Sequence, residues 1–475
     1  MAAAVVSIRL MTSLLSPAEV GRYTVVLALT GWFALTLISP IGNYFNRQLL
    51  WWVKTDAFWE ACRRYLLLLL PIVLVSVAAS LALEHAHIID IGIQPRSYAA
   101  IIAGVLIFLT VNTMLIDFVN QLGSRIAYVL ATSATLWLGL LASLILATHD
   151  HKTAESWIAG QVIGWALVGM VAVVLLRGIV RRAAARLERR VAVDQSLWAF
   201  AWPLVLSTSL YWFQIQGYRL VLVHWLDLAA LGLLSTGLTL GTNPMAIVDT
   251  LLMEYLRPRY YQRIADGERL SQEAAWREVA GQVVGSLLPI AVFVGLSGPF
   301  LVVLLVGPRF HSVAGLVLWG AAFEYARAVN TLYVLAVHTS LRTRTTLKPN
   351  LVGALVTLVA IGPLTRWSVV NGPGLALTGG MWVATFLQGY SLRPYFTAAF
   401  PVRGFLRAGV ASLPLIALAA IIRVNVHRPD ALQSLLAVAG LGAATLATVV
   451  FLVWTLARAE RRSPIAGQPD SVARL

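Results

Sequence analysis

The sequence has almost no cysteine and little charge. Its one cysteine, Cys62, excludes a disulfide within the chain and a cysteine-based zinc site. Only 12% of the 475 residues are charged and 59% are apolar, which is too hydrophobic for a soluble globular protein. No clear small-residue cleavage site follows an early apolar run, so we expect no removed signal peptide. The composition predicts a polytopic membrane protein.

Arginine carries most of the basic charge. The chain has 33 arginines and three lysines, and its formal net charge is +15. These residues are dispersed over short connections between apolar runs, whereas a nucleic-acid-binding domain gathers them on one face. We therefore expect the lipid bilayer as a partner and no nucleic acid.

Apolar runs of membrane-spanning length recur along the whole chain. Each is near the ~20 residues that a helix needs to cross a bilayer, except the first, which is shorter. Fourteen runs lie at roughly residues 1–15, 22–46, 65–83, 98–120, 127–147, 156–176, 198–225, 230–256, 279–306, 313–339, 349–366, 374–392, 404–423 and 433–457. The sequence therefore predicts an all-α polytopic membrane protein with about 14 transmembrane helices.

A basic stretch divides these runs into six before it and eight after it. It holds six arginines from Arg177 to Arg190, while Ile179, Ala183 and Leu187 recur at every fourth position. This pattern is typical of a short helix lying on anionic headgroups. A solvated basic loop on the cytoplasmic side explains the charge equally well.

The division predicts two pseudo-symmetric six-helix lobes plus two C-terminal helices. We expect these last two helices to be peripheral and to border a lipid groove. The predicted parts are an N-terminal lobe at 1–176, a basic cytoplasmic connector at 177–197, a C-terminal lobe at 198–392, two peripheral helices at 393–457 and a cytoplasmic tail at 458–475.

The distribution of basic residues predicts the orientation in the membrane. If the odd-numbered runs point outward, 26 of the 36 basic residues lie on the cytoplasmic side and seven outside. Three arginines, Arg9, Arg219 and Arg327, remain inside apolar runs. The positive-inside rule then predicts that both termini are cytoplasmic.

An internal repeat supports the two lobes. Arg9 precedes Gly21 by twelve residues, and Arg219 precedes Gly232 by thirteen, in hairpins that look like copies. Six runs separate the hairpins, so the copies share one orientation and are expected to enclose a cleft. Because the first run is shorter than its counterpart, we expect the native chain to start upstream of Met1.

Four short motifs resemble those of one transporter family. The stretch Arg9-Leu-Met-Thr-Ser-Leu-Leu-Ser-Pro-Ala-Glu-Val-Gly-Arg-Tyr23 resembles the opening hairpin of polysaccharide biosynthesis flippases. Further matches, in the family's order, are Phe200-Ala-Trp-Pro203, Leu304-Leu-Val-Gly-Pro-Arg-Phe310 and Gly372-Pro-Gly-Leu-Ala-Leu-Thr-Gly379. The chain thus resembles the multidrug/oligosaccharidyl-lipid/polysaccharide exporter (MOP) superfamily.

The resemblance implies a function in the bacterial cytoplasmic (inner) membrane. Similar proteins move undecaprenyl-pyrophosphate-linked oligosaccharides, such as O-antigen or exopolysaccharide repeat units, between leaflets by alternating access. They are not enzymes and need no cofactor. Polysaccharide polymerases and glycosyltransferases are the partners expected from it.

Arg9 and Arg219 occupy matched positions near the outer ends of the first and seventh runs. If both face the cleft, their guanidinium groups can bind a pyrophosphate through bidentate hydrogen bonds. Alternatively, both side chains reach the outer headgroups. The first hypothesis predicts that Arg9, Arg219 and Arg327 open onto one shared cavity.

Glu324, Arg327 and Asn330 follow one another at intervals of three residues in the middle of the tenth run. This spacing places them on one helix face and predicts a Glu324–Arg327 ion pair. The pair is either purely structural or part of a cleft-lining site. In the second case Arg327 and Asn330 bind substrate, and Glu324 orients the arginine or exchanges it for a cation.

Asp117 and Asp249 lie near the ends of the fourth and eighth runs. One interpretation is that both are charged side chains near the membrane interface, where nearby residues or water interact with them. With Glu324, they are also the candidate ion-coupling residues, since charged groups inside membrane spans often mark ion pathways.

Two further groups have weaker patterns. Gln214 and Gln216 suit sugar contacts if they line the cleft, although aromatic neighbours such as Trp212 also fit an interfacial belt. His85 and His87 in one outer loop, with histidines in another, fit solvated side chains better than a metal site. We therefore expect no metal.

Two other functions remain open. A cation-coupled multidrug exporter of the same superfamily would need carboxylates deep in the first lobe, where Asp117 is the one candidate. A membrane glycosyltransferase or polymerase would need a sizeable loop with converging acid and base groups, and the predicted outer loops are short.

Overall fold

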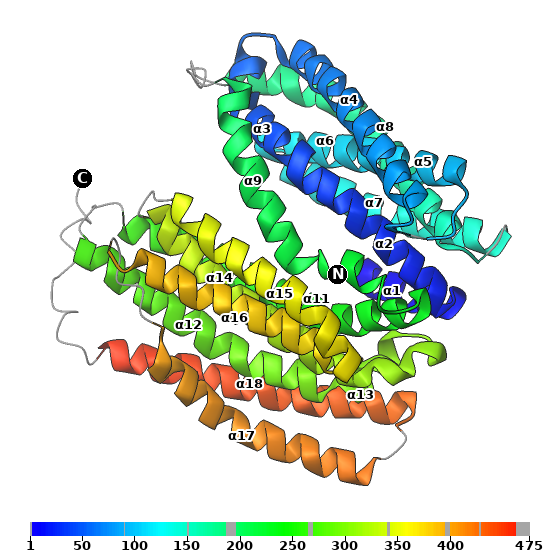
Figure 1. Cartoon of the computed structure of the whole chain (residues 1–475). Coiled ribbons are helices and arrows are strands. Elements are labelled where there is room, and N and C mark those ends of the chain that lie inside the picture. The colour runs from blue at the N-terminus through cyan, green and yellow to red at the C-terminus, as the bar shows by residue number, and fades with distance from the viewer. Residues whose placement is uncertain are drawn as a thin grey trace. The chain divides into compact units, whose positions relative to one another are not determined.

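The computed structural model describes residues 2–89, 91–149, 152–186, 196–264, 269–339, 343–394, 400–426 and 429–461 (Figure 1). All regular elements within these ranges are helices. Ten of them, counting contiguous helices together, are long and apolar enough to cross a membrane. The predicted all-α polytopic membrane fold is therefore confirmed.

The chain divides into two compact units. The first comprises Met1–Thr236, Leu305–Ser312 and Ala354–Pro373, and the second comprises Gly237–Leu304, Val313–Gly353 and Gly374–Leu475. Helices that begin in the first unit include α1 (Ala2–Leu14), α2 (Pro17–Phe33), η1 (Ala34–Ile38), α3 (Ser39–Lys54), α4 (Phe58–His85), α5 (Pro95–Gly104), η2 (Val105–Leu109), α6 (Thr110–Gln121), α7 (Arg125–His149), α8 (Ala154–Arg186), α9 (Leu197–Ile215), α10 (Tyr218–Leu222), α11 (Leu228–Arg263) and η3 (Pro308–Val313).

The second unit is built around α12 (Arg269–Leu296). This helix packs against α14 (Ala314–Thr339), α17 (Val402–Asn425) and α18 (Ala431–Arg461), and the last two also contact each other (Figure 1). Leu406, Val410 and Phe451 line a groove of about 550 Å³ between α17 and α18. The remaining elements, shared between the units or within the second, are α13 (Gly298–Leu305), η4 (Thr343–Thr346), α15 (Leu347–Trp367) and α16 (Gly372–Leu392).

Four predicted spans are interrupted in the structure, and one of these, the ninth span, breaks at Ser297, between α12 and α13. The second and fourth spans each contain a five-residue π-helix, η1 and η2, between two α-helices. The seventh span breaks at Gln216 and Gly217, between α9 and α10. The basic stretch begins as the last turns of α8, and residues 187–195 lie outside the described residues, so the predicted connector stays a prediction.

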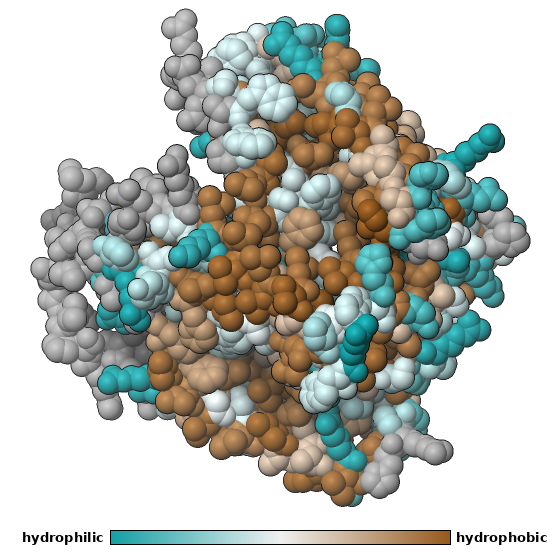
Figure 2. Space-filling view, in the orientation of Figure 1, coloured by the Kyte–Doolittle hydropathy of each residue, from teal (hydrophilic) through white to brown (hydrophobic). Residues whose placement is uncertain are grey.

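Many apolar side chains are exposed, as expected for helices that face lipid. Leu74 on α4 is 69% exposed and Leu446 on α18 is 66% exposed. Apolar side chains also cover much of the visible surface in Figure 2. In water such surface would favour aggregation, whereas in a bilayer it matches the solvent.

Polar contacts at the N-terminus of α2 connect this helix to another helix of the first unit. Ser16 caps the helix by accepting a hydrogen bond from the Glu19 amide, with Pro17 at the first helical position. The Glu19 carboxylate binds Arg22 at 2.5 Å and accepts a hydrogen bond from the Ala154 amide, the first of α8, at 2.7 Å. A carboxylate at a helix N-terminus is stabilising, so Glu19 joins α2 to α8.

The two glycines that the internal repeat aligns lie where α2 meets the start of α11. A Cβ added to Gly21 would lie 1.9 Å from the carbonyl oxygen of Leu228, and one added to Gly232 would lie 2.0 Å from that of Pro17. Both contacts are to backbone atoms, which cannot move aside as a side chain can. Glycine at both positions therefore permits a close approach of the repeated hairpins.

We predict that Gly21→Ala destabilises the protein, because the new methyl group would overlap the backbone of α11. Overpacking of this kind costs about 1–3 kcal/mol. Gly409→Ala on α17 is the matched control, since nothing lies within 4 Å of its added Cβ. Thermal unfolding in detergent should show a lower midpoint for Gly21→Ala and an unchanged or higher one for Gly409→Ala. Equal midpoints would contradict the close packing.

Candidate functional site

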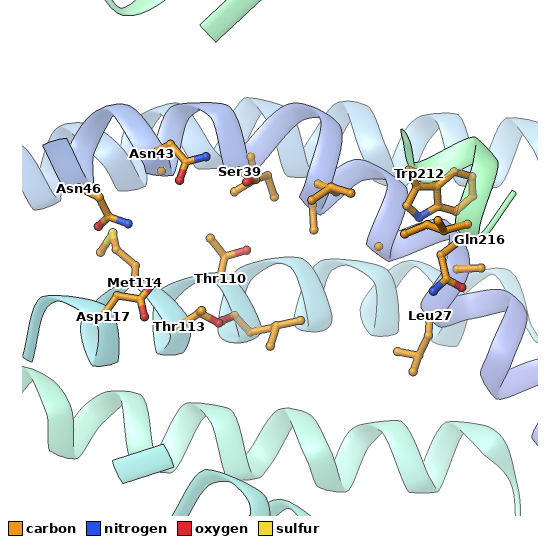
Figure 3. Close-up of a pocket in the computed structure, with 18 of the residues that line it drawn as sticks. Leu27, Ser39, Asn43, Asn46, Thr110, Thr113, Met114, Asp117, Trp212 and Gln216 are labelled. Atoms are coloured by element: carbon orange, nitrogen blue, oxygen red, sulfur yellow. The ribbon is translucent and has the colours of Figure 1, made fainter. Parts of the chain in front are cut away.

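A cavity of about 640 Å³ lies within the first unit (Figure 3). Helices α2, α3, α4, α6, α9 and α10 and both π-helices contribute to its wall. Apolar residues such as Leu27, Ile38 and Trp212 form part of the lining. The polar lining residues are Ser39, Asn43, Asn46, Tyr65, Thr110, Thr113, Asp117, Gln216 and Arg219. Its size falls in the range of ~300–1,000 Å³ that is usual for small-molecule sites.

Two helices present polar stripes to this cavity. On α3, Ser39, Asn43 and Asn46 stand at positions i, i+4 and i+7. Residues at this spacing share one face of an α-helix, so all three reach the same cavity. Figure 3 shows them along one side of the cavity.

The second stripe lies on α6, across the cavity. Thr110, Thr113 and Asp117 stand at positions i, i+3 and i+7. Figure 3 shows these three facing the stripe of α3. The sequence analysis missed most of both stripes, although their helical spacing inside apolar runs was a usable signal.

Each stripe begins directly after a π-helix. The segment η1 ends at Ile38, one residue before Ser39, and η2 ends at Leu109, one residue before Thr110. π-Helices are rare and occur frequently at functional sites. They set the rotation of the following helix and so help to aim both stripes into the cavity.

Arg219 lies at the end of the cavity near α9 and α10. Its Nη1 donates to Oε1 of Gln216, which Figure 3 shows beside Trp212, and its guanidinium stacks on Tyr218 at 5.2 Å from the ring centroid. Its Nε is buried, and no acceptor for it exists among the described residues. A buried guanidinium donor without an acceptor favours an anionic ligand.

Asp117 lies at the opposite end, together with Asn46 and Met114 (Figure 3). Asn46 Oδ1 is buried and has no donor among the described residues. Thr113, one turn before Asp117, donates its hydroxyl hydrogen to the Leu109 carbonyl at 2.6 Å. The Thr113 hydroxyl oxygen can therefore act only as a hydrogen-bond acceptor toward a ligand. This end therefore presents hydrogen-bond acceptors.

The structure thus brings three of the predicted site residues to one cavity, namely Gln216, Arg219 and Asp117. Gln214 is fully buried and does not line it. The sequence placed Asp117 near a helix end and did not associate it with Arg219. The helices of Asp117 and Arg219 line one cavity only in the folded chain.

Arg9 is engaged elsewhere in the first unit. Its Nη1 donates to the carbonyl of Val306, and Thr12 on the same helix accepts a hydrogen bond from the Gly307 amide at 2.9 Å. Arg9 does not line the cavity described above. Arg327 belongs to the second unit, so the cavity shared by all three arginines stays a prediction.

The second unit contains a buried group of one arginine and two carboxylates. Arg327 binds Glu324 at 2.6 Å, as the spacing on α14 predicts, and Asp249 of α11 at 3.2 Å. Glu324 and Asp249 are 4% and 6% exposed, so the triad has a formal net charge of −1 when both carboxylates are ionised. Asn330, on the same face of α14, receives a hydrogen bond from Thr385 at 3.4 Å.

The contact between Asp249 and Arg327 was not predicted. The two residues are 78 positions apart, and only the packing of α11 against α14 joins them. The approach depends on small residues, since a Cβ on Gly241 would lie 2.2 Å from the carbonyl oxygen of Val317.

No group of three or more histidine, cysteine or acidic side chains within the described residues is arranged to hold a metal ion. Of the histidines near the predicted outer loops, His85, His87 and His149 are described, while Asp150 and His151 lie outside the described residues. The prediction that the protein binds no metal stays a prediction.

We predict that Arg327→Met destabilises the protein because it leaves two carboxylates buried without a cation. Removing one partner of a buried ion pair costs about 3–5 kcal/mol. The triple variant Asp249→Asn, Glu324→Gln, Arg327→Met removes all three charges and should recover most of the loss. Thermal unfolding of both variants checks this, and a single variant as stable as the wild type would contradict it.

No protein-family model matches the chain, and no curated protein matches its sequence. The solved structures that are similar to it include two transporters. Lipid II flippase MurJ in an inward closed conformation aligns with a TM-score of 0.59 and 11% identity, over 94% of this chain and 98% of its own. An inward-facing multidrug resistance MATE family transporter of the MOP superfamily aligns with a TM-score of 0.61 and 10% identity, over 86% of this chain and 94% of its own. The chain therefore has the fold of the flippases and exporters of the MOP superfamily.

Proposed function

We propose that this protein is a flippase for lipid-linked oligosaccharides. It moves undecaprenyl-pyrophosphate-linked repeat units, of O-antigen or exopolysaccharide, from the cytoplasmic to the periplasmic leaflet by alternating access. The bond chemistry belongs to partner polymerases and glycosyltransferases, and this protein is not an enzyme. The fold supports a transporter, since both similar structures are named as transporters.

Arg219 is the residue that carries this proposal. Its side chain lines a cavity whose other polar lining is mostly neutral amide and hydroxyl groups, and its buried Nε has no acceptor among the described residues. A phosphate supplies the missing acceptor, and sugars match the amides and hydroxyls. Few other headgroups combine one strong anion with many neutral polar groups.

The distribution of basic residues along the chain supports a location and an orientation in the membrane. We place the protein in the bacterial cytoplasmic membrane with both termini in the cytoplasm, because 26 of 36 basic residues then lie on that side. Asp117, near the end of the fourth span, then lies toward the cytoplasmic end of the cavity, and Arg219 lies toward the outer end.

The triad of Asp249, Glu324 and Arg327 is our candidate for ion coupling. One guanidinium cannot neutralise two buried carboxylates, and Asp249 Oδ1 is buried without a donor among the described residues. A proton or a monovalent cation at this oxygen would neutralise the triad. Binding and release of that cation would drive the cycle, and Asn330, three residues beyond Arg327 on α14, is our candidate for a second polar contact.

A multidrug exporter is the second candidate function. Asp117 favours it, because this carboxylate lines the cavity and would attract a cationic drug. Arg219 opposes it by repelling the same ligand. The two functions therefore differ in which of these two residues is essential.

We predict that Arg219→Gln blocks flipping. Losing a charge-assisted contact to phosphate costs about 1.5–3 kcal/mol, which is roughly a 10- to 100-fold loss of rate. The measurement is the amount of cytoplasm-facing undecaprenyl-pyrophosphate oligosaccharide in cells that lack the protein and carry each variant. Wild type should relieve the accumulation, Arg219→Lys should relieve it in part, and Arg219→Gln should not.

The control is Arg96→Gln, which removes an exposed arginine outside the cavity and should behave as wild type. If the deletion strain accumulates no such lipid and becomes sensitive to cationic drugs, the protein is a multidrug exporter and not a flippase. Loss of drug resistance in Asp117→Asn would then support that function.

A further inference from the structure

The cavity of the first unit has two chemically opposite ends. At one end, Arg219 offers a buried donor that lacks an acceptor. At the other end, Asn46 Oδ1 is a buried acceptor that lacks a donor, and no hydrogen bond joins the Asp117 carboxylate to another described residue. Figure 3 places Asn46 and Asp117 together at one end, and Gln216, the partner of Arg219, at the other.

The groups at the Asp117 end that lack a hydrogen-bond partner all need a ligand that donates hydrogen bonds. The carboxylate and the amide oxygen are acceptors, and the Thr113 hydroxyl hydrogen is already bound to Leu109. The diesterified pyrophosphate of the proposed lipid is fully ionised at neutral pH, so it has only acceptors and would be repelled here. Sugar hydroxyl groups are donors, and adjacent hydroxyls on one ring can reach two acceptors at once.

We propose that Asn46, Thr113 and Asp117 form a sugar-binding subsite that is separate from the phosphate-binding end at Arg219. The subsite takes hydroxyl donors of sugars beyond the one attached to the pyrophosphate. It rests on the proposed flippase function and deepens it, because it assigns the recognition of the oligosaccharide to residues on α3 and α6.

Spacing along the cavity supports two subsites. The stripes of α3 and α6 run between the two ends, and Asn43 and Thr110 lie between them (Figure 3). These intermediate groups are neutral and suit further hydroxyls. A headgroup with its phosphate at Arg219 therefore has a continuous polar wall along which its sugars extend.

The subsite predicts that the protein distinguishes lipids by the length of their glycan. The experiment uses the full-length protein in proteoliposomes with two polyprenyl-pyrophosphate lipids, one bearing a single sugar and one bearing an oligosaccharide. Flipping is measured as accessibility of the sugars to membrane-impermeant periodate. Asn46→Leu and Asp117→Leu each remove an acceptor and keep the number of side-chain heavy atoms.

Both variants should flip the oligosaccharide lipid about tenfold more slowly than wild type, as expected for one or two lost hydrogen bonds. The single-sugar lipid should move at the wild-type rate. Asp117→Asn retains an acceptor oxygen and should lose much less than Asp117→Leu. Asn425→Leu, the same change at an exposed site on α17, should move both lipids as wild type does.

Several results would overturn the subsite. Equal losses for both lipids, or no loss for either, would show that the Asp117 end does not recognise the distal sugars. Complete loss in Asp117→Asn together with sodium-dependent transport by the wild type would replace the sugar with a cation. If the wild-type protein moves neither lipid, the flippase function itself fails, and this result is distinct from the others.

Discussion

A bilayer supplies no hydrogen bonds, so every polar group within it needs a partner from the protein or from a ligand. Most described groups in the spans obey this constraint by local means. Ser76 and Ser80 donate to carbonyls one turn back on their own helix, and the indole of Trp276 donates to the Leu332 carbonyl across helices. Against this background, the groups that remain unsatisfied are informative. Arg219 Nε and Asn46 Oδ1 lie at one cavity, and Asp249 Oδ1 lies in the triad. These are three of the unsatisfied buried groups among the described residues, and in the proposed function a ligand, a proton or an ion completes each of them.

Close approach of helices is the second constraint, since polar groups can be paired between spans only when backbones come near each other. Lipid does not push helices together as water does, so small residues and good contacts must hold them. Gly21 and Gly232 allow the two repeated hairpins to meet, and Gly241 with Gly320 allows α11 to approach α14. The second contact is what brings Asp249 within reach of Arg327. Close helix packing at glycine residues therefore determines which charged side chains can form ion pairs.

Much of the fold was predictable, because the fourteen apolar runs follow directly from the cost of placing charge in hydrocarbon. The internal repeat was also visible, and its aligned glycines prove to be contact points. The breaks at η1, η2 and Gly217 were not predictable, since apolar composition does not distinguish an α-helix from a π-helix. Arg219, Gln216 and Asp117 were chosen individually as polar residues in apolar runs. That they share one cavity depends on tertiary packing, as does the ion pair between Asp249 and Arg327. The stripes on α3 and α6 were within reach of helical periodicity and were overlooked.

In the proposed function, the substrate-binding cavity lies in the first unit and the ion-coupling triad lies in the second. The helix α11 contains residues of both units. Its first residues belong to the first unit, where Gly232 meets α2, and Asp249 lies further along in the second unit. A cation that arrives at Asp249 changes a buried net charge of −1 to zero, which alters how strongly α11 is held to α14 through Arg327. Asp249 and Gly232 lie on the same helix, on either side of Pro244, so the candidate ion site and the contact with α2 share one element of the chain. The helix α2 continues through η1 into α3, which carries Asn46. Both candidate sites are therefore built on elements that join at the glycine contact.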